Sequence, residues 1–448
     1  MRHRGFGGIF SVAALASALG LGGVAAIAVG TPLASGGVAG LPAPAPFDIH
    51  IGSMPTTAPP TIAQCELTYG VPCYGPPQLQ AAYDMTSLYK AGDEGKGETI
   101  VLVDAYGSPT IKSDLAAFDA GFKLPAPPSF KIIQPAGTVT GSNSSWAGET
   151  TLDVEYSHAM APEANILLVE TPVNETIGTA GFPQIVQAEE YVLKHHLGDV
   201  ISQSFGAAEQ TFPSATSIMN LRGAYTLAAK DNVTVLASSG DAGVSSPSNI
   251  AGTTYFTKRV VNWPASDPLV TAVGGTQLHL TQAGKRTAPD NVWNDTALLD
   301  EPAAASGGVS SVFARPSYQS SVSSVVGSWR GVPDVALSAA VDGAAIIYEG
   351  GYQIVGGTSE ASPLFAGIVA IADQVAGHDL GDLNPALYTL GSGAAGLPDI
   401  TKGNNTVSFT QGGKSYTVTG YTAVAGYDLA SGLGTVDGAE LVAELAAP

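Results

Sequence analysis

The chain has 448 residues, enough to bury the core of one large domain or two ordinary ones. Its formal net charge of −20, from 18 basic and 38 acidic residues, argues against nucleic acid and anionic membrane surfaces as partners. Only 12% of the residues are charged, while Gly (55) and Pro (30) are frequent, which indicates many tight turns.

The N-terminus begins Met-Arg-His-Arg and continues with an apolar run of small residues. This order is typical of a secretory signal, so residues 1–35 are predicted to be a signal peptide and the protein to be secreted. The run is long for a signal, and a membrane anchor stays open as the alternative. Residues 36–62 are rich in Pro, Ala and Gly and are expected to form a flexible leader. Residues 63–448 are predicted to be the folded domain.

The two cysteines, Cys65 and Cys73, are close in sequence. In an exported chain such a pair more often forms a local disulfide than a metal site.

Strands and helices alternate through the domain. Apolar strands are predicted near residues 98–107, 165–170, 199–206, 233–241, 268–275 and 343–359, and helices near residues 113–122, 184–196 and 215–231. This alternation predicts an α/β fold, a doubly wound and mostly parallel sheet with helices on both faces. In such folds substrates bind beyond the carboxyl ends of the strands.

Three carboxylates are candidates for chemistry. Glu149 and Asp153 are four residues apart, which on a helix places both side chains on one face. Such a pair is usually a solvated surface, and the functional alternative is a buried pair that shares a proton. Asp241 follows a predicted strand in a Ser-Gly-Asp-Ala-Gly loop, either as a turn residue or as a carboxylic acid beside a reacting carbonyl.

A small-residue turn, Gly357-Thr358-Ser359, leads to Pro363 and then into a segment that is apolar on every side, which predicts a buried helix. If Ser359 is near the N-cap, Pro363 falls within the first turn. The Ser359 hydroxyl then lies at the positive end of the helix dipole, where negative charge is stabilised. An ordinary Ser cap is the alternative interpretation.

A histidine-based triad is the competing arrangement. None of the seven histidines lies in an evident catalytic motif, and His158 is more than two helical turns from Glu149. The sequence also lacks H-E-x-x-H, P-loop and G-x-S-x-G patterns. A histidine-based triad is therefore disfavoured.

Three motifs in this order, the Glu149/Asp153 pair, Ser239-Gly240-Asp241 and Gly357-Thr358-Ser359 to Pro363, resemble the sedolisin family of serine-carboxyl peptidases. The similarity extends from about Cys65 to the C-terminus and implies a subtilisin-like fold. It implies that Ser359 is the nucleophile, Glu149 the general base and acid, Asp153 its partner and Asp241 the oxyanion donor.

The resemblance also implies two binding regions. The strand end Ser204, Phe205 and Gly206 is similar to the family's edge that pairs with substrate main chain. The C-terminal loops resemble the family's structural Ca²⁺ site, with ligands from Asp399, Ile400, Val424, Gly426 and Asp428. Val424 stands where the family commonly has Gly, an exchange that is tolerated if the backbone does not need a positive φ.

The implied function is that of a secreted, monomeric endopeptidase acting on polypeptides in acid. An imidazole with a pKa of about 6.5 is protonated at pH 4, while a Glu near 4.3 still accepts a proton. Asp241 must be protonated to donate to an oxyanion, so activity is expected below about pH 5. A tripeptidyl-peptidase type of exopeptidase and a catalytically silent secreted binding protein are the alternatives. The family's large folded propeptide has no counterpart in residues 36–62, so a separate propeptide chain and self-sufficient folding both stay open.

Overall fold

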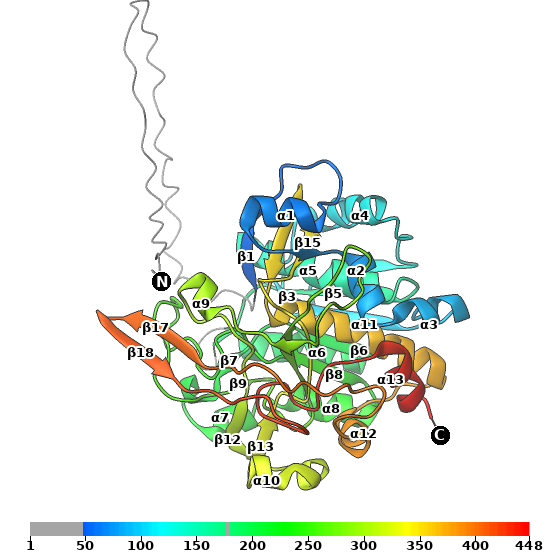
Figure 1. The fold of residues 1–448 in the computed structure, drawn as a ribbon. Coiled ribbons are helices and arrows are strands. Elements are labelled where there is room, and N and C mark those ends of the chain that lie inside the picture. The colour runs from blue at the N-terminus through cyan, green and yellow to red at the C-terminus, as the bar shows by residue number, and fades with distance from the viewer. Residues whose placement is uncertain (1–47, 176–179, 448) are drawn as a thin grey trace, which may run out of the picture. The chain divides into compact units, whose positions relative to one another are not determined.

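The computed structural model describes residues 48–175 and 180–447 (Figure 1). The predicted signal peptide, residues 1–35, and the first part of the predicted leader lie outside these ranges. Within the ranges, no helix has the length and apolar character needed to cross a membrane.

The central sheet has the strand order β11-β10-β8-β6-β3-β5-β4, and β14 also pairs with β10. Every pairing is parallel except that of β10 with β11, which is antiparallel. The prediction of a mostly parallel α/β sheet is therefore confirmed. The strands are β3 (Thr99–Ala105), β4 (Phe130–Ile133), β5 (Asn165–Thr171), β6 (Val200–Gln203), β8 (Thr234–Ser238), β10 (Thr271–Gln277), β11 (Asn291–Val292) and β14 (Val335–Ser338).

Helices cover both faces of this sheet (Figure 1). Ile100 and Leu102 of β3 belong to the core shared with α5 (Ser144–Met160) and α11 (Thr358–Ala376). The alternate residues Val101 and Val103 belong to the core shared with α6 (Phe182–Lys194) and α8 (Gly223–Asp231). Successive side chains of a strand point to opposite faces, so a continuous apolar run is needed where both faces are buried.

Two predicted segments differ from the structure. The single helix predicted over 215–231 is two helices, α7 (Ala215–Met219) and α8, with a break at Asn220–Arg222. The strands near 343–359, β15 (Ala344–Tyr348) and β16 (Tyr352–Gly356), form a hairpin that belongs to a second sheet of order β1-β16-β15-β2.

The second sheet also changes the extent of the folded domain. Its edge strand β1 (Ile49–Ser53) pairs antiparallel with β16 and lies within the segment predicted as a flexible leader, residues 36–62. Ile49 and Ile51 alternate with polar or small residues, as in a half-buried strand, but the surrounding Pro and Gly hide this short signal. The second half of the predicted leader, from Asp48 on, is thus part of the folded body.

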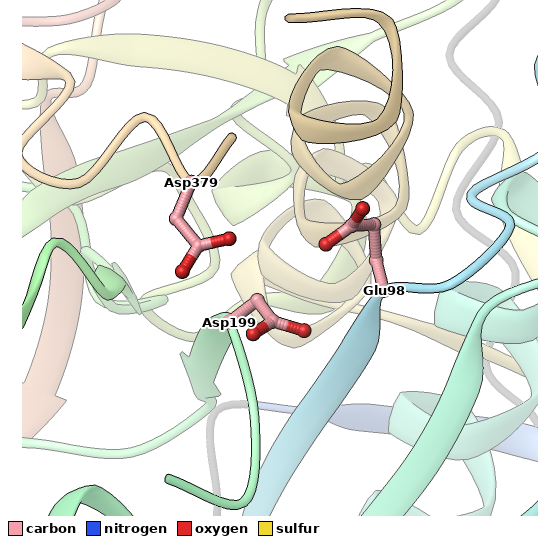
Figure 2. A group of neighbouring side chains, drawn as sticks. All are labelled: Glu98, Asp199 and Asp379. Carbon is pink, nitrogen blue, oxygen red and sulfur yellow. The ribbon is translucent and has the colours of Figure 1, made fainter. Parts of the chain in front are cut away.

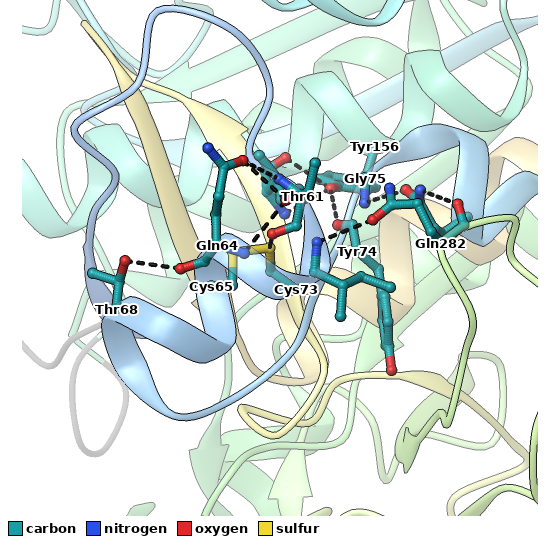
Figure 3. Close-up of a disulfide and its surroundings, with 12 residues drawn as sticks. Thr61, Gln64, Cys65, Thr68, Cys73, Tyr74, Gly75, Tyr156 and Gln282 are labelled. Atoms are coloured by element: carbon teal, nitrogen blue, oxygen red, sulfur yellow. Dashed lines mark hydrogen bonds between the residues drawn. A yellow bond between two sulfur atoms is a disulfide. The ribbon is translucent and has the colours of Figure 1, made fainter.

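The predicted local disulfide is confirmed. Cys65 in α1 (Ile62–Tyr69) is bonded to Cys73 in β2 (Cys73–Tyr74), with both residues buried (Figure 3). The bond ties α1 to the second sheet.

The other elements complete the chain. They are α2 (Pro76–Ala82), α3 (Met85–Ala91), α4 (Ile111–Phe122), β7 (Ala207–Ala208), β9 (Asn262–Trp263), α9 (Thr296–Leu299), β12 (Gly308–Ala314), α10 (Ser323–Val326), β13 (Trp329–Val332), α12 (Asn384–Leu390), β17 (Val407–Gln411), β18 (Lys414–Val418) and α13 (Gly438–Leu445), with 3-10 turns at Glu209–Thr211 and Ser317–Val322.

Candidate active site

The candidate nucleophile lies in the first turn of α11. Gly357 precedes the helix with φ +133°, a backbone conformation that residues other than Gly rarely adopt. Ser359 is the second helical residue. Pro363 is the sixth helical residue, so the prediction that it falls in the first turn is wrong. Because Pro has no N–H, it cannot bond the Ser359 carbonyl, which the Ser204 hydroxyl approaches at 3.5 Å instead.

Asp241 follows β8 and caps the same helix. Its Oδ1 accepts bonds from the Thr358 N–H (2.8 Å) and the Thr358 hydroxyl (2.6 Å). The hydroxyl in turn accepts from the Gly240 N–H at 3.1 Å, which fixes the direction of its own proton. Asp241 keeps some exposed surface, but its Oδ2 is buried and has no partner among the described residues. With Oδ1 already accepting two bonds, a proton on this carboxyl is best carried by Oδ2.

Burial is the main reason that the Asp241 pKa is raised well above its ordinary value. The two bonds from Thr358 oppose the rise, and the charge of Asp48 adds to it. A raised pKa keeps the carboxyl protonated, as hydrogen-bond donation requires.

Glu149 and Asp153 lie on one face of α5, both with side chains that are 0% exposed. The pair is therefore buried, not solvated. Asp153 Oδ1 accepts a bond from the Ser204 hydroxyl at 2.8 Å. Burial, reinforced by the neighbouring carboxylates, raises the pKa of both residues well above the ordinary range.

Ser359 approaches Glu149 without a fully formed hydrogen bond. The hydroxyl moderates the rise in the Glu149 pKa, but neither Glu149 oxygen has a partner of normal geometry. The Ser359 hydroxyl instead donates to the Ser204 carbonyl over a long 3.4 Å. Catalytic hydrogen bonds are often loose without substrate, so we treat this approach as a contact.

Two further carboxylates belong to the group and were missed from sequence. Asp104, near the carboxyl end of β3, has a pKa raised to about 7, first by burial and then by Glu170. Asp48, directly before β1, has a pKa raised to about 7 by burial. The charges of both raise the pKa of Glu149 and Asp153. Asp104 lies toward the carboxyl end of the strand predicted near residues 98–107, which is a usable signal, whereas Asp48 lies in the predicted leader, where no signal marks it.

None of the carboxylates of this group forms an ion pair in the ranges that the structure covers. Their ion pairs involve other carboxylates, at Asp119, Glu190, Asp267, Asp290 and Asp334. Crowded carboxylates without a cation must share protons. The group is therefore suited to acid.

The three residues of the predicted substrate edge, Ser204, Phe205 and Gly206, have different environments. Ser204 lies between Asp153 and Ser359, as described above. Phe205 is buried, with its ring 6.4 Å from that of Trp146. Only Gly206 keeps partial exposure. Main-chain pairing with substrate at this edge stays a prediction.

His158 does not compete for the role of the base. It is buried in the last turn of α5, where its Nε2 lies 2.8 Å from the Pro125 carbonyl and 3.3 Å from Asp119 Oδ1.

The five predicted calcium ligands lie in two loops that the structure brings together. Asp399 Oδ2 accepts a bond from the Gly426 N–H, and Asp428 Oδ2 accepts one from the Val424 N–H, each at 2.9 Å. Val424 is not among the residues with positive φ, so its side chain is tolerated there. The carbonyl oxygens of Ile400, Val424 and Gly426 accept no bond from the described residues. Two carboxylates and three free carbonyls form a donor set that fits Ca²⁺.

Comparison with known proteins agrees with this geometry. The model of the subtilase peptidase family matches residues 133–386, more than half of the chain. Kumamolisin of Bacillus sp. (strain MN-32) is 33% identical over 381 residues, covering 83% of this chain and 63% of that protein. Sedolisin of Pseudomonas sp. (strain 101) is 31% identical over 379 residues, covering 83% of this chain and 61% of that protein.

A solved structure is also similar to this chain. Pseudomonas sedolisin, a serine-carboxyl proteinase complexed with two molecules of pseudo-iodotyrostatin, superposes with a TM-score of 0.70 at 27% identity. The superposition covers 83% of this chain and 98% of that one. The chain spans about six tenths of the length of the curated relatives named above.

The matched model and the parallel sheet define the class: the chain belongs to the subtilase family. Within that class, the similarity to kumamolisin and sedolisin and the superposition on sedolisin place it in the sedolisin family.

Proposed function

We propose that this protein is a serine-carboxyl endopeptidase that hydrolyses polypeptides in acid, with Ser359 as nucleophile. The observation that carries the proposal is Asp241, whose Oδ1 accepts two bonds from Thr358 while its buried Oδ2 has no partner. Such a carboxylic acid is a preorganised donor for the oxyanion of a tetrahedral intermediate, provided that it is protonated.

The reaction uses the neighbouring carboxylates as the base. Glu149 takes the proton of the Ser359 hydroxyl as the oxygen attacks the scissile carbonyl, and returns it to the leaving amine. Asp153, held by the Ser204 hydroxyl, shares a proton with Asp104 beside Glu149. Water then cleaves the acyl-enzyme with Glu149 again as base. Asp241 donates to the oxyanion in both halves of the reaction.

Endopeptidase activity distinguishes this proposal from its nearest alternative. A tripeptidyl-peptidase of Aspergillus fumigatus is 33% identical over 374 residues, so exopeptidase activity is the second candidate. An endopeptidase is expected to cleave an N-terminally acetylated decapeptide library at pH 4 as readily as the free-amine library, measured by mass spectrometry. Cleavage of free-amine peptides alone, with release of tripeptides, would favour the exopeptidase.

The alternative of a catalytically silent binding protein predicts the opposite result. It would cleave neither library, although Ser359, Glu149, Asp153 and Asp241 are all present and adjacent. Ser359→Ala in the full chain is the matched control, because it removes the hydroxyl and leaves the carboxylates in place.

We also propose that the C-terminal loops bind one structural Ca²⁺. Asp428→Asn is expected to lower the calcium stoichiometry of the full chain by one, measured by equilibrium dialysis at pH 7 in the Ser359→Ala background. At a free Ca²⁺ concentration of 100 Kd such a site adds about 2.7 kcal/mol to the free energy of unfolding. An unchanged stoichiometry would contradict this assignment.

A further inference from the structure

Three carboxylates converge at the edge of the central sheet opposite the active site. Glu98 directly precedes β3, Asp199 directly precedes β6, and Asp379 follows the end of α11. One oxygen from each lies within 4.8 Å of the other two, and Figure 2 shows the three side chains directed toward a common space. This is the amino edge of the strands, whereas Asp104 and Asp241 lie at the carboxyl edge.

The sheet fixes this arrangement. Asp199 Oδ2 accepts the Thr99 N–H at 2.7 Å, and the Asp199 N–H donates to the Thr99 carbonyl at 3.0 Å. The carbonyl of Glu98 accepts the Asn165 N–H at 2.8 Å. The backbones that carry Glu98 and Asp199 are therefore held by strand pairing, and one oxygen of Asp199 stays available.

A fourth carboxylate, Asp373, lies beside the cluster, bonded to the residue that follows Asp379. Asp373 lies near the end of α11 and is 0% exposed, and its Oδ1 accepts a bond from the Leu380 N–H at 2.8 Å. Its buried Oδ2 has no partner among the described residues. Burial first, and then the charges of Glu98, Asp379 and Asp199, raise the pKa of Asp373 to about 8.

No cationic side chain compensates these charges in the part of the chain that the structure describes, because none of its ion pairs includes one of the four residues. A buried carboxylate oxygen without a donor is costly, and three like charges beside it add to the cost. A bound cation removes both penalties together.

We propose that Glu98, Asp199 and Asp379 form a second cation site beside the buried carboxyl of Asp373, specific for a hard divalent ion and best suited to Ca²⁺. All the donors are carboxylate oxygens from separate segments. Hard cations prefer such oxygens, and Ca²⁺ accepts a more varied coordination geometry than Mg²⁺ does. The site is distinct from the predicted site at Asp399 and Asp428.

The position of this site indicates what the ion does. Asp373 and Ser359 are 14 residues apart on α11, or about 21 Å along the helix at 1.5 Å per residue. The ion therefore takes no part in the chemistry. It joins the starts of β3 and β6 to the end of the helix that carries the nucleophile.

The test measures calcium stoichiometry in the full chain with Ser359→Ala, which prevents self-digestion. Equilibrium dialysis at pH 7 is expected to show one Ca²⁺ fewer per chain in Glu98→Gln/Asp379→Asn than in the parent. A control with the same change of charge, Glu66→Gln/Asp300→Asn, replaces exposed carboxylates and is expected to bind as the parent does. Combining Glu98→Gln/Asp379→Asn with Asp428→Asn separates the two sites.

Thermal unfolding gives a readout that a purely structural cluster would not produce. In a chelator, Glu98→Gln/Asp379→Asn is expected to melt at or above the temperature of the parent, because it relieves repulsion. Saturating Ca²⁺ is expected to raise its Tm less than that of the parent. If the single variant Asp379→Asn and the double variant both keep the parental stoichiometry and the parental Ca²⁺-dependent rise in Tm, the proposal is overturned.

Discussion

Asp241→Ala is expected to lower kcat at pH 4 by about 10²- to 10³-fold, whereas Asp241→Asn retains a substantial part of the activity. Ala removes both the cap on Thr358 and the donor to the oxyanion. Asn keeps the cap through its Oδ1 and offers its Nδ2–H in place of the acid proton. Rates on a quenched fluorescent peptide, with circular dichroism to verify folding, measure the difference.

Asp241→Asn is also expected to change the pH dependence of the activity. In the parent, activity is lost as pH rises through the Asp241 pKa, because the donor becomes a repelling charge. An amide does not titrate, so this loss of activity is expected to move to higher pH in Asp241→Asn. Equal and complete loss of activity in both variants at every pH would contradict the role of Asp241 as a hydrogen-bond donor.

The second large effect is on stability. Glu360 and Glu189 are buried with pKa values raised to about 8, and Asp104 has one raised to about 7. A raised pKa means that the folded state binds more protons than the unfolded state between about pH 4 and pH 8. The free energy of unfolding is therefore expected to fall as pH rises through this interval. Since one pKa unit corresponds to about 1.4 kcal/mol, several such groups together make a difference on the order of several kcal/mol.

Urea unfolding of Ser359→Ala at pH 4, 6 and 8 measures this dependence. The midpoint is expected to be highest at pH 4. Glu360→Gln, which cannot ionise, should flatten the decline, while the exposed control Glu66→Gln should leave it unchanged. A midpoint that increases from pH 4 to pH 8 would show that these carboxylates are not protonated in the folded protein.

The parallel sheet could be predicted because β3 and β5 are long apolar runs between recognisable helices. Motif residues such as Asp241 and Ser359 could be placed at strand or helix ends by the same reasoning. Their convergence needed the family resemblance, because spacing along a chain does not determine strand order.

Other features depend on contacts that no local pattern reveals. β1 is five residues long and becomes a strand only because β16 offers an edge. Asp48 acquires its environment through that pairing. Glu98, Asp199 and Asp379 are 100 or more residues apart and meet because parallel strands begin at one edge. The position of Pro363 in α11 was misjudged because a helix start is uncertain by a residue or two from sequence, and the exact start decides which carbonyl is left free.

The central claim is that Ser359 works with carboxylates in acid. The most direct measurement is the pH dependence of kcat/KM on a peptide substrate from pH 2 to 9, with Ser359→Ala as control. We predict a maximum below about pH 5, almost no activity at pH 7 and none at any pH in Ser359→Ala. A maximum at neutral or alkaline pH, or activity that survives in Ser359→Ala, would contradict the account.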